Sequence, residues 1–366
     1  MLMKIYTCVS KIVFDFHVCV SLKNEAKSMS INWQMIPKVL LHEHLDGGLR
    51  PQTLLELCRA RNLPTPANTA PDLASWVQAN ANSGSLVRYL QGFGLTVGAM
   101  ASVAACERVA YEACEDARLD GCVLAEFRIA PLLLEEFGLA GEAVVEALLR
   151  GMKKSTLVAG LIVCGMRHEP AANTLRSAQL AARYADAGVV GFDLAGAEHG
   201  FPPSLHARAI AVARDAGLGI TLHAGEADSG ARVIEAAALG ATRIGHGVNI
   251  MASADGHTHR AWVDDARARG LHFEVCPTSN VHTGAAASIA THPLRAMVEA
   301  GLSVSVSTDN RLMSGITMSE EFRNVHTENG ISLSALRAMM EAGANASFLP
   351  KPKRDAALEA LRAVQI

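Results

Sequence analysis

The sequence predicts an α/β protein, a (β/α)8 TIM barrel with a helical insertion after the first strand. Eight short apolar segments alternate with longer segments of helical composition, and most of the apolar segments lack strict polar alternation. Such segments are typical of strands buried on both faces of a parallel sheet. Polar residues stand at the C-terminal ends of most of these apolar segments. This favours a barrel, because a doubly wound open sheet needs polar strand ends only beside its switch point.

The predicted strands are followed in turn by predicted helices. The strands span residues 39–46, 122–131, 160–168, 189–198, 219–226, 243–248, 272–280 and 303–310. The segment SLHARAIAVARDAGLG ends at a glycine, as a capped helix does. Residues 52–121 are predicted to be mostly helical. Because they leave from the end of the first strand, we expect them to form a lid over the pocket.

The overall composition is that of a globular protein, and it favours a small-molecule partner over a nucleic acid. The 366 residues are 50% hydrophobic and 19% charged, with a net charge of −3. The chain lacks the excess of basic residues that would indicate a nucleic-acid-binding surface. The eight cysteines form no CxxC pair, which favours reduced thiols and a cytoplasmic location. The oligomeric state is left open.

Residues 1–34 differ from the rest of the chain. Their apolar middle is interrupted by Asp15 and His17, and it is too short and too charged to span a membrane. A secretory signal is the alternative interpretation. We expect an appendage outside the fold, followed by a single domain over residues 35–366. No other segment approaches the length of a membrane span, so no membrane partner is expected.

Histidines and one acid at the strand ends predict a metal site. His42 and His44 are two residues apart on a strand, so both side chains point to the same face. His223 and Asp309 close the fifth and eighth strands. Three imidazoles and one carboxylate are a typical donor set for a catalytic divalent metal such as zinc that also binds a water molecule.

The lysine distribution predicts one metal ion, and two further residues suit proton chemistry. Two-metal barrels of this type commonly bridge their ions with a carboxylated lysine from the fourth strand, but the chain has no lysine between Lys154 and Lys351. Glu226 follows His223 by three residues and suits proton delivery. His246 lies between two glycines, and we expect it beside the bound water as a base or an electrostatic stabiliser.

Seven motifs in order resemble those of the adenosine deaminase family, in the adenosine and AMP deaminase branch of the amidohydrolase superfamily. They are LHEHLDG, DLAGAE, LHAGE, RIGHGV, CPTSN, STDN and SFLP, between about residues 36 and 350. The resemblance implies a single zinc ion held by His42, His44, His223 and Asp309. It also implies hydrolytic deamination of adenosine, and of 2′-deoxyadenosine, to inosine and ammonia by attack of zinc hydroxide on purine C6.

The resemblance implies roles for residues that would contact a purine nucleoside. Glu226 would protonate N1, and His246 would orient and help deprotonate the water. The backbone amide of Gly196 would meet N3, and Asp46 would bind a ribose hydroxyl. His44 would border the substrate as well as the metal. The segment 89–94, YLQGFG, resembles the apolar gate over the pocket.

The sequence departs from the family pattern at two positions. Asn310 follows Asp309 where the commonest pattern has a second aspartate, and its amide could donate to N7 of the base. This leaves base preference and rate open. Glu43 stands between the two predicted histidine ligands in place of an apolar or small residue. We expect it to point away from the pocket with little effect on the chemistry.

Several other functions compete with adenosine deamination. Deaminases of adenine or aminodeoxyfutalosine tend to carry Glu at the position of Asp46, which favours a nucleoside here. AMP is disfavoured, because the predicted pocket has few basic residues and no phosphate cradle. A non-catalytic adenosine-binding protein would have lost a ligand or Glu226. A metal-dependent ester or lactone hydrolase would usually need a second metal.

Overall fold

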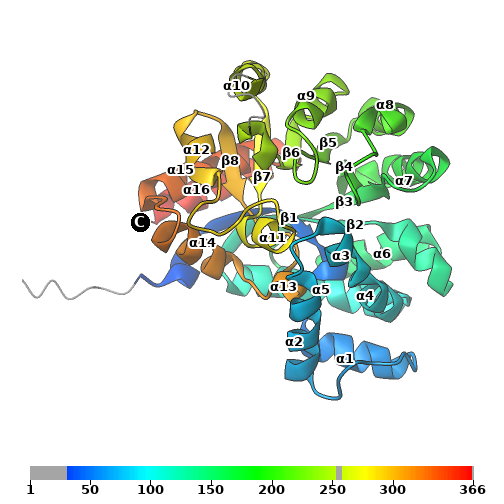
Figure 1. The fold of residues 1–366 in the computed structure, drawn as a ribbon. Coiled ribbons are helices and arrows are strands. Elements are labelled where there is room, and N and C mark those ends of the chain that lie inside the picture. The colour runs from blue at the N-terminus through cyan, green and yellow to red at the C-terminus, as the bar shows by residue number, and fades with distance from the viewer. Residues whose placement is uncertain (1–30, 253–257, 365–366) are drawn as a thin grey trace, which may run out of the picture. The chain divides into compact units, whose positions relative to one another are not determined.

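The computed structural model describes residues 31–252 and 258–364, and these residues form the predicted barrel (Figure 1). Eight parallel strands lie in chain order, each hydrogen-bonded to the next. Their bounds are β1 Lys38–His44, β2 Cys122–Ile129, β3 Val158–Met166, β4 Val189–Ala195, β5 Gly219–Ala224, β6 Arg243–His246, β7 His272–Val275 and β8 Ser303–Val306. The predicted fold class is therefore confirmed.

The ring closes between β1 and β8 at the carboxyl ends of the strands. Glu43 and Asp309 form a parallel bridge there. The amide of His44 donates to the carbonyl of Asp309 at 2.8 Å, and the amide of Asp309 donates to the carbonyl of His42 at 2.9 Å. Closure of the barrel therefore brings the end of the first strand against the loop that follows the last.

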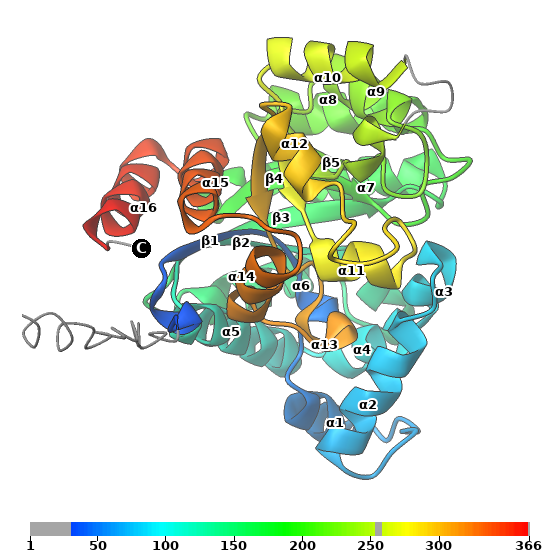
Figure 2. The same ribbon diagram turned by 60° about the vertical axis from the view of Figure 1, so that its left-hand side comes forward.

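The predicted insertion after β1 is helical, as expected. It consists of α1 Pro51–Ala60, α2 Ala70–Ala81, α3 Leu86–Gln91, α4 Phe93–Met100 and α5 Val103–Leu119. In both views α1 and α2 lie on the side of the molecule away from the helices α8 to α10 (Figures 1 and 2). Figure 2 also shows α3 and α4 leading from α2 towards the loops at the strand ends.

The remaining helices pack around the barrel or lie within the loops that connect its strands to those helices. The longer ones are α6 Gly141–Met152, α7 Ala171–Arg183, α8 Ala207–Asp215, α9 Ala231–Ala238, α10 Thr258–Ala268, α14 Met318–Thr327, α15 Leu333–Ala346 and α16 Lys351–Ala363. Shorter ones are α11 Pro277–His282, α12 Leu294–Glu299 and α13 Arg311–Ser314. The 3-10 turns are η1 Trp33–Met35, η2 Leu45–Gly47, η3 Pro131–Phe137, η4 Ala185–Ala187, η5 Pro203–His206 and η6 Val248–Met251. Local signals start some of them; Thr317, for example, forms a capping box with Glu320 at α14.

Several strands end earlier than the sequence predicts. The last strand residues of β7 and β8 are Val275 and Val306, so the polar residues expected on these strands lie in the following loops. Pro277 occupies the first position of α11 and starts a helix there. His246 and Asp309 both have φ of +61°, a left-handed conformation that cannot continue a strand. The chemistry is therefore concentrated just beyond the sheet.

One continuous apolar core joins the strands to the helices around them. Phe127, Phe192 and Phe273, from three different strands, have no exposed surface. Truncating a buried phenylalanine to alanine costs about 3–5 kcal/mol, because a cavity remains. This packing gives the strand ends a rigid base.

The predicted appendage over residues 1–34 lies almost entirely outside the described residues, so its boundary remains a prediction. In the described part of the chain, no single helix is long and apolar enough to cross a membrane. One bent pair, residues 86–100 with α5, meets the same length and composition criteria across a 116° break.

Candidate metal centre and pocket

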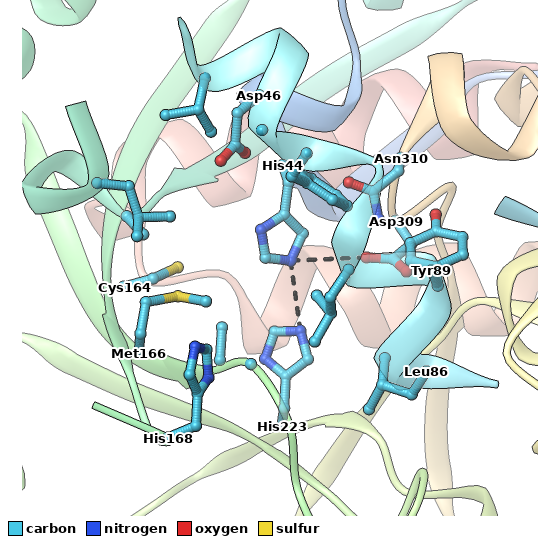
Figure 3. Close-up of a pocket in the computed structure, with 18 of the residues that line it drawn as sticks. His44, Asp46, Leu86, Tyr89, Cys164, Met166, His168, His223, Asp309 and Asn310 are labelled. Carbon is cyan, nitrogen blue, oxygen red and sulfur yellow. Dashed lines mark hydrogen bonds and ion pairs between the residues drawn. The ribbon is translucent and has the colours of Figure 1, made fainter. Parts of the chain in front are cut away.

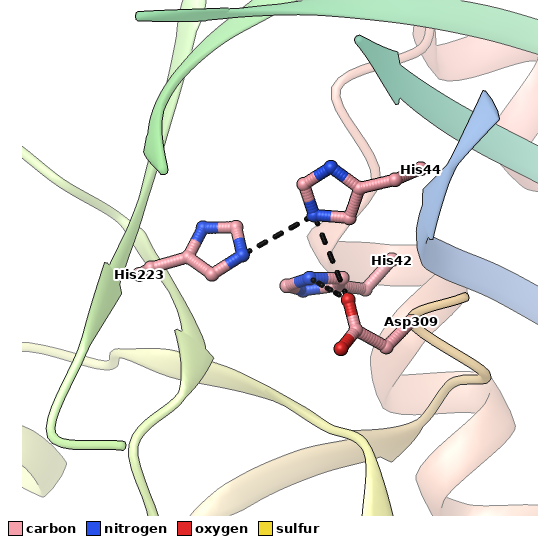
Figure 4. Close-up of side chains that lie close together, drawn as sticks. All are labelled: His42, His44, His223 and Asp309. Atoms are coloured by element: carbon pink, nitrogen blue, oxygen red, sulfur yellow. Dashed lines mark hydrogen bonds and ion pairs between the residues drawn. The ribbon is translucent and has the colours of Figure 1, made fainter. Parts of the chain in front are cut away.

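The four predicted metal ligands lie together at the carboxyl end of the barrel (Figure 4). His42 and His44 come from β1, His223 from β5, and Asp309 from the loop after β8. One donor atom from each lies within 4.8 Å of the others. His42 Nε2 is 3.2 Å from Asp309 Oδ1, and the Nε2 atoms of His44 and His223 are 3.3 Å apart.

A glycine on β6 allows two of the imidazoles to approach this closely. A Cβ atom on Gly245 would lie 2.9 Å from His42 Cε1 and 3.3 Å from His223 Cγ. Any side chain there would displace one of the rings. Gly245 is part of the RIGHGV motif, and its role is to leave room for the donor set.

Buried carboxylates orient two of the histidines. His42 Nδ1 lies 2.9 Å from Glu274 Oε2, and His223 Nδ1 lies 2.9 Å from Asp193 Oδ2. Each carboxylate accepts the Nδ1–H and leaves Nε2 with a free lone pair that faces the centre. His42 Nε2 is buried, and apart from its 3.2 Å approach to Asp309 Oδ1 it has no hydrogen-bond partner within the described ranges. Both features fit a bound divalent metal ion, which uses deprotonated imidazole nitrogens.

A buried arginine keeps these carboxylates charged. Arg128, from β2, donates to Asp193 Oδ2 at 2.8 Å and to Glu274 Oε2 at 2.5 Å. Burial alone would raise the pKa of Glu274, but Arg128, Arg243 and His42 hold that pKa well below its usual range. A charged carboxylate is the stronger acceptor for the imidazole N–H.

The sequence analysis assigned no role to Asp193, Glu274 or Arg128. Each is a charged residue flanked by an apolar residue on both sides within its strand, and each has no exposed surface. Charged residues are almost never fully buried unless they are paired. A charged residue between two apolar strand residues therefore predicts a buried ion pair, and this pattern could have identified all three residues from the sequence.

Glu226 lies in the turn after β5 and is buried, with 5% of its surface exposed. Its Oε1 accepts from Thr283 Oγ1 at 2.9 Å and from Asn280 Nδ2 at 3.3 Å. Burial, and then the charge of Asp309, raise the pKa of Glu226 to about 8. Because both donors contact Oε1, the proton belongs on Oε2, which lies 3.6 Å from His246 Nε2.

A chain of hydrogen bonds defines the tautomer of His246. The amide of Leu294 donates to His292 Nδ1 at 3.0 Å, so His292 Nε2–H donates to Asn280 Oδ1 at 3.2 Å. The Asn280 amide group therefore points its Nδ2 at His246 Nδ1, 3.0 Å away. Burial keeps the pKa of His246 well below its usual value. The neutral ring then carries its proton on Nε2. This favours a role for His246 as an electrostatic stabiliser over a role as a base.

The pocket above the donor set has one apolar and one mixed wall (Figure 3). Leu86, Tyr89, Leu90, Phe93 and Val97 of α3 and α4 form the apolar wall, and three of these residues belong to the predicted gate segment 89–94. The other side is lined mainly by Ala130, Leu133, Cys164, Met166, His168 and Ala195. All the predicted substrate-contacting residues also line this pocket: His44, Asp46, Gly196, Glu226, His246 and Asn310.

Two side-chain oxygen atoms of pocket residues lack a hydrogen-bond partner. Asp46 Oδ1 and Asn310 Oδ1 are buried, and neither has a hydrogen-bond partner in the described part of the protein. Burial raises the pKa of Asp46 to about 7. Unsatisfied buried groups at a pocket wall are typical of a site that a ligand completes. The position of Asn310 also explains why residue 47 is a glycine, since a Cβ atom on Gly47 would lie 1.8 Å from Asn310 Oδ1.

Gly196 follows β4 and lies beside the pocket with φ of +95°. A Cβ at this position would be 2.6 Å from His168 Nδ1. Both the conformation and the space therefore require glycine, and they leave its backbone open to the pocket.

Glu43 points away from the pocket, as expected. Its carboxylate accepts from Arg311 Nε at 2.5 Å and from Thr308 Oγ1 at 2.9 Å. Arg311 also donates to the carbonyl of Gly48 at 3.1 Å. The buried ion pair thus ties β1 to the loop that carries Asp309, a structural role that the sequence analysis did not foresee.

The fold and the donor set define a metal-dependent hydrolase of the barrel class. The sequence profile of the adenosine deaminase family matches residues 37–364, and the chain belongs to that family. It is 43% identical to the adenosine deaminase of Mycolicibacterium gilvum over 344 residues, which cover 90% of this chain and 94% of the relative.

Solved structures agree with the fold. The N6-mAMP deaminase of Arabidopsis matches with a TM-score of 0.79 and 25% identity, covering 91% of this chain and 99% of that one. An amidohydrolase from Burkholderia ambifaria, solved with bound zinc, matches with a TM-score of 0.77 and 23% identity, covering 91% and 94%. The latter likeness concerns the fold alone.

Proposed function

We propose that this protein is an adenosine deaminase that converts adenosine, and 2′-deoxyadenosine, to inosine and ammonia. One observation carries the proposal: a metal donor set and a buried carboxyl with a pKa of about 8 share one pocket. Hydrolytic deamination at C6 of a purine needs an activated water and an acid that can protonate the ring. The pocket holds groups suited to both tasks.

The proposed cofactor is one zinc ion per chain, held by His42, His44, His223 and Asp309. Imidazole nitrogens with one carboxylate oxygen suit zinc better than calcium or magnesium, which prefer oxygen ligands. When bound, zinc would supply activation of a water molecule at neutral pH. This is the one group of three or more clustered metal-binding side chains within the described ranges. The absence of lysine between Lys154 and Lys351 also argues against a bridged pair of ions.

Glu226 is the proposed acid. In its protonated form Oε2–H donates a proton to N1 of the purine while the water adds at C6, so that the ring does not accumulate negative charge. Thr283 and Asn280 keep Oε1 occupied and direct the proton outward. His246 Nε2–H donates to the attacking oxygen and stabilises the charge that develops there. The hydroxyl proton of this adduct then passes to the C6 amino group, which leaves as ammonia, and the next water taken up by the site returns a proton to Glu226.

The proposed nucleoside contacts use polar groups that line the pocket, among them the unsatisfied carboxylate of Asp46. Asp46 would bind a ribose hydroxyl, the amide of Gly196 would donate to N3, and Asn310 would donate from Nδ2 to N7. The apolar wall of α3 and α4 would cover the base. None of the described residues that line the pocket is Lys or Arg, and Glu136 lies at its wall. This supports a neutral nucleoside over a nucleotide.

A substrate panel tests the proposal. Ammonia release is measured with adenosine, 2′-deoxyadenosine, adenine, AMP and aminodeoxyfutalosine, and metal content is measured on the same preparation. We expect adenosine to have the highest kcat/KM, AMP the lowest, and close to one zinc per chain. A clear preference for adenine or aminodeoxyfutalosine would move the assignment to another aminopurine, and two bound ions would contradict the single-metal site.

A further inference from the structure

The loop that carries Glu226 is bound to a single buried carboxylate outside the pocket. Glu198, from the loop after β4, is only 2% exposed. The amide of Gly225 donates to its Oε1 at 2.5 Å. The amides of Glu226, Ala227 and Asp228 donate to its Oε2 at 2.9, 2.7 and 3.2 Å. Four consecutive amides therefore converge on one side chain.

This arrangement requires a carboxylate. Successive amides that face one side of a loop form an anion-binding nest. An ionised carboxylate has two oxygens with about four acceptor positions, whereas an amide side chain offers one oxygen and an opposing NH2 group. Hydrogen bonds to a charged acceptor are also stronger than neutral ones. Glu198 thus holds the backbone of residues 225–228 in one conformation.

Asn249 binds the same loop from its carbonyl side. Its Nδ2 donates to the carbonyls of Glu226 and Asp228, both at 2.9 Å. Its own amide donates to the carbonyl of Gly225 at 2.8 Å. Asn249 lies on η6, three residues after His246. The loop of Glu226 is therefore also bound to the turn that carries His246.

Glu198 lies close to a buried counter-charge. Arg167 has no exposed surface and donates from Nη2 to the carbonyls of Leu194, at 2.9 Å, and His223. Burial lowers the pKa of Arg167, and the negative charge of Glu198 opposes that shift. Neither Glu198 nor Asn249 lines the pocket, so neither contacts a substrate there.

We propose that Glu198 and Asn249 are positioning residues that act through Glu226. They hold the loop so that the carboxyl of Glu226 meets the ring nitrogen at the distance proton transfer needs. The inference rests on the proposed role of Glu226. Because a misplacement of about 1 Å can cost roughly 100-fold in rate, the effect falls on kcat more than on KM.

The first test replaces Glu198 with glutamine. Glu198→Gln puts an NH2 group against the loop amides, and we expect kcat for adenosine to fall by about 10- to 100-fold. KM should stay within about threefold and zinc content should be unchanged, since neither the pocket lining nor the ligands are altered. Asn249→Leu, which keeps Glu198 and its counter-charge, should lower kcat in the same way, and it serves as the test if Glu198→Gln does not fold.

Asp120→Asn is the matched control. The Asp120 carboxylate accepts from the amide of Ser319 at 3.0 Å and from its hydroxyl, next to the start of β2 and thus at the other end of the barrel. This variant also weakens a carboxylate-to-backbone contact. We expect it to lower the melting temperature without changing kcat.

A double-mutant cycle separates positioning from a general structural effect. In the Glu226→Gln background, Glu198→Gln should cause no further loss of kcat, because residues that act as a unit are non-additive. A full additional loss, or a wild-type kcat in the single variant, would overturn the inference alone. A wild-type protein that releases no ammonia from any aminopurine in the panel would overturn the proposed function, and this inference with it.

Discussion

The strand-end wall of the pocket and the wall formed by α3 and α4 hold their side chains in different ways. The strand-end wall carries His223, His246 and Glu226, at and just beyond the ends of β5 and β6, and each bonds to at least one buried polar partner. On the helical wall the contacts are mostly apolar, and Tyr89 has one long hydrogen bond, 3.3 Å to Ser314 Oγ. Oriented groups suit chemistry, which needs defined geometry, whereas apolar contacts suit reversible enclosure of a substrate.

The difference predicts that strand-end variants change kcat or metal affinity, and that helical-wall variants change KM. The largest effect is expected for Glu226→Gln. A glutamine keeps the shape but cannot transfer a proton to N1, so kcat should fall by about 100- to 10,000-fold. Zinc content and the affinity for inosine should be retained. Steady-state kinetics with metal analysis checks this, and a near-normal kcat would remove Glu226 from the proton-delivery role.

The second effect concerns metal affinity. Glu274→Gln removes the charged acceptor of His42 Nδ1–H, and we expect zinc affinity to fall by about 10- to 100-fold in competition with a chelator. Glu126→Gln is the control: Glu126 is equally buried and pairs with Arg243, but it binds the backbone of Phe348 at 2.6 Å and no metal ligand. If both variants lost zinc affinity to the same extent, the loss would reflect a general destabilisation of the protein and not the contact between Glu274 and His42.

The third effect is the pH dependence of kcat/KM, which reports the pKa values of the free enzyme. The pKa of Glu226 is raised to about 8, so the group is protonated below that pH and loses its proton as the pH rises through it. Loss of the acid should lower kcat/KM by about tenfold for each pH unit above that pKa. The profile is measured from pH 6 to 10 with adenosine well below KM. The residual activity of Glu226→Gln should lack this alkaline decline; its persistence would assign the decline to another group.

The smallest effect is expected on the helical wall. Leu86→Ala removes apolar surface that lines the pocket, so KM for adenosine should rise by about three- to tenfold while kcat stays within about twofold. Val87→Ala is the matched control, because Val87 is on the same helix but is 58% exposed and does not line the pocket. A large loss of kcat in Leu86→Ala would mean that both walls position reacting groups.

Local patterns in the sequence were sufficient for the barrel and for the grouping of the candidate residues. The two-residue spacing of His42 and His44 places both on one strand face, and parallel strands of a barrel bring all their carboxyl ends to one rim. His223 and Asp309 therefore meet them without any knowledge of packing. The strand limits were less accurate, because Pro277 and the left-handed backbone of Asp309 end strands in ways that hydrophobicity does not report.

Only the tertiary structure decided how these groups are held and charged. Glu274 reaches His42 across 232 residues, and Asn280 reaches His246 across 34, so no local pattern connects them. The raised pKa of Glu226 comes from burial, which exists only once the barrel and its insertion have closed over it. A sequence specifies residue types and spacing along the chain. Hydrogen-bond partners and desolvation depend on distances between segments that folding alone brings together.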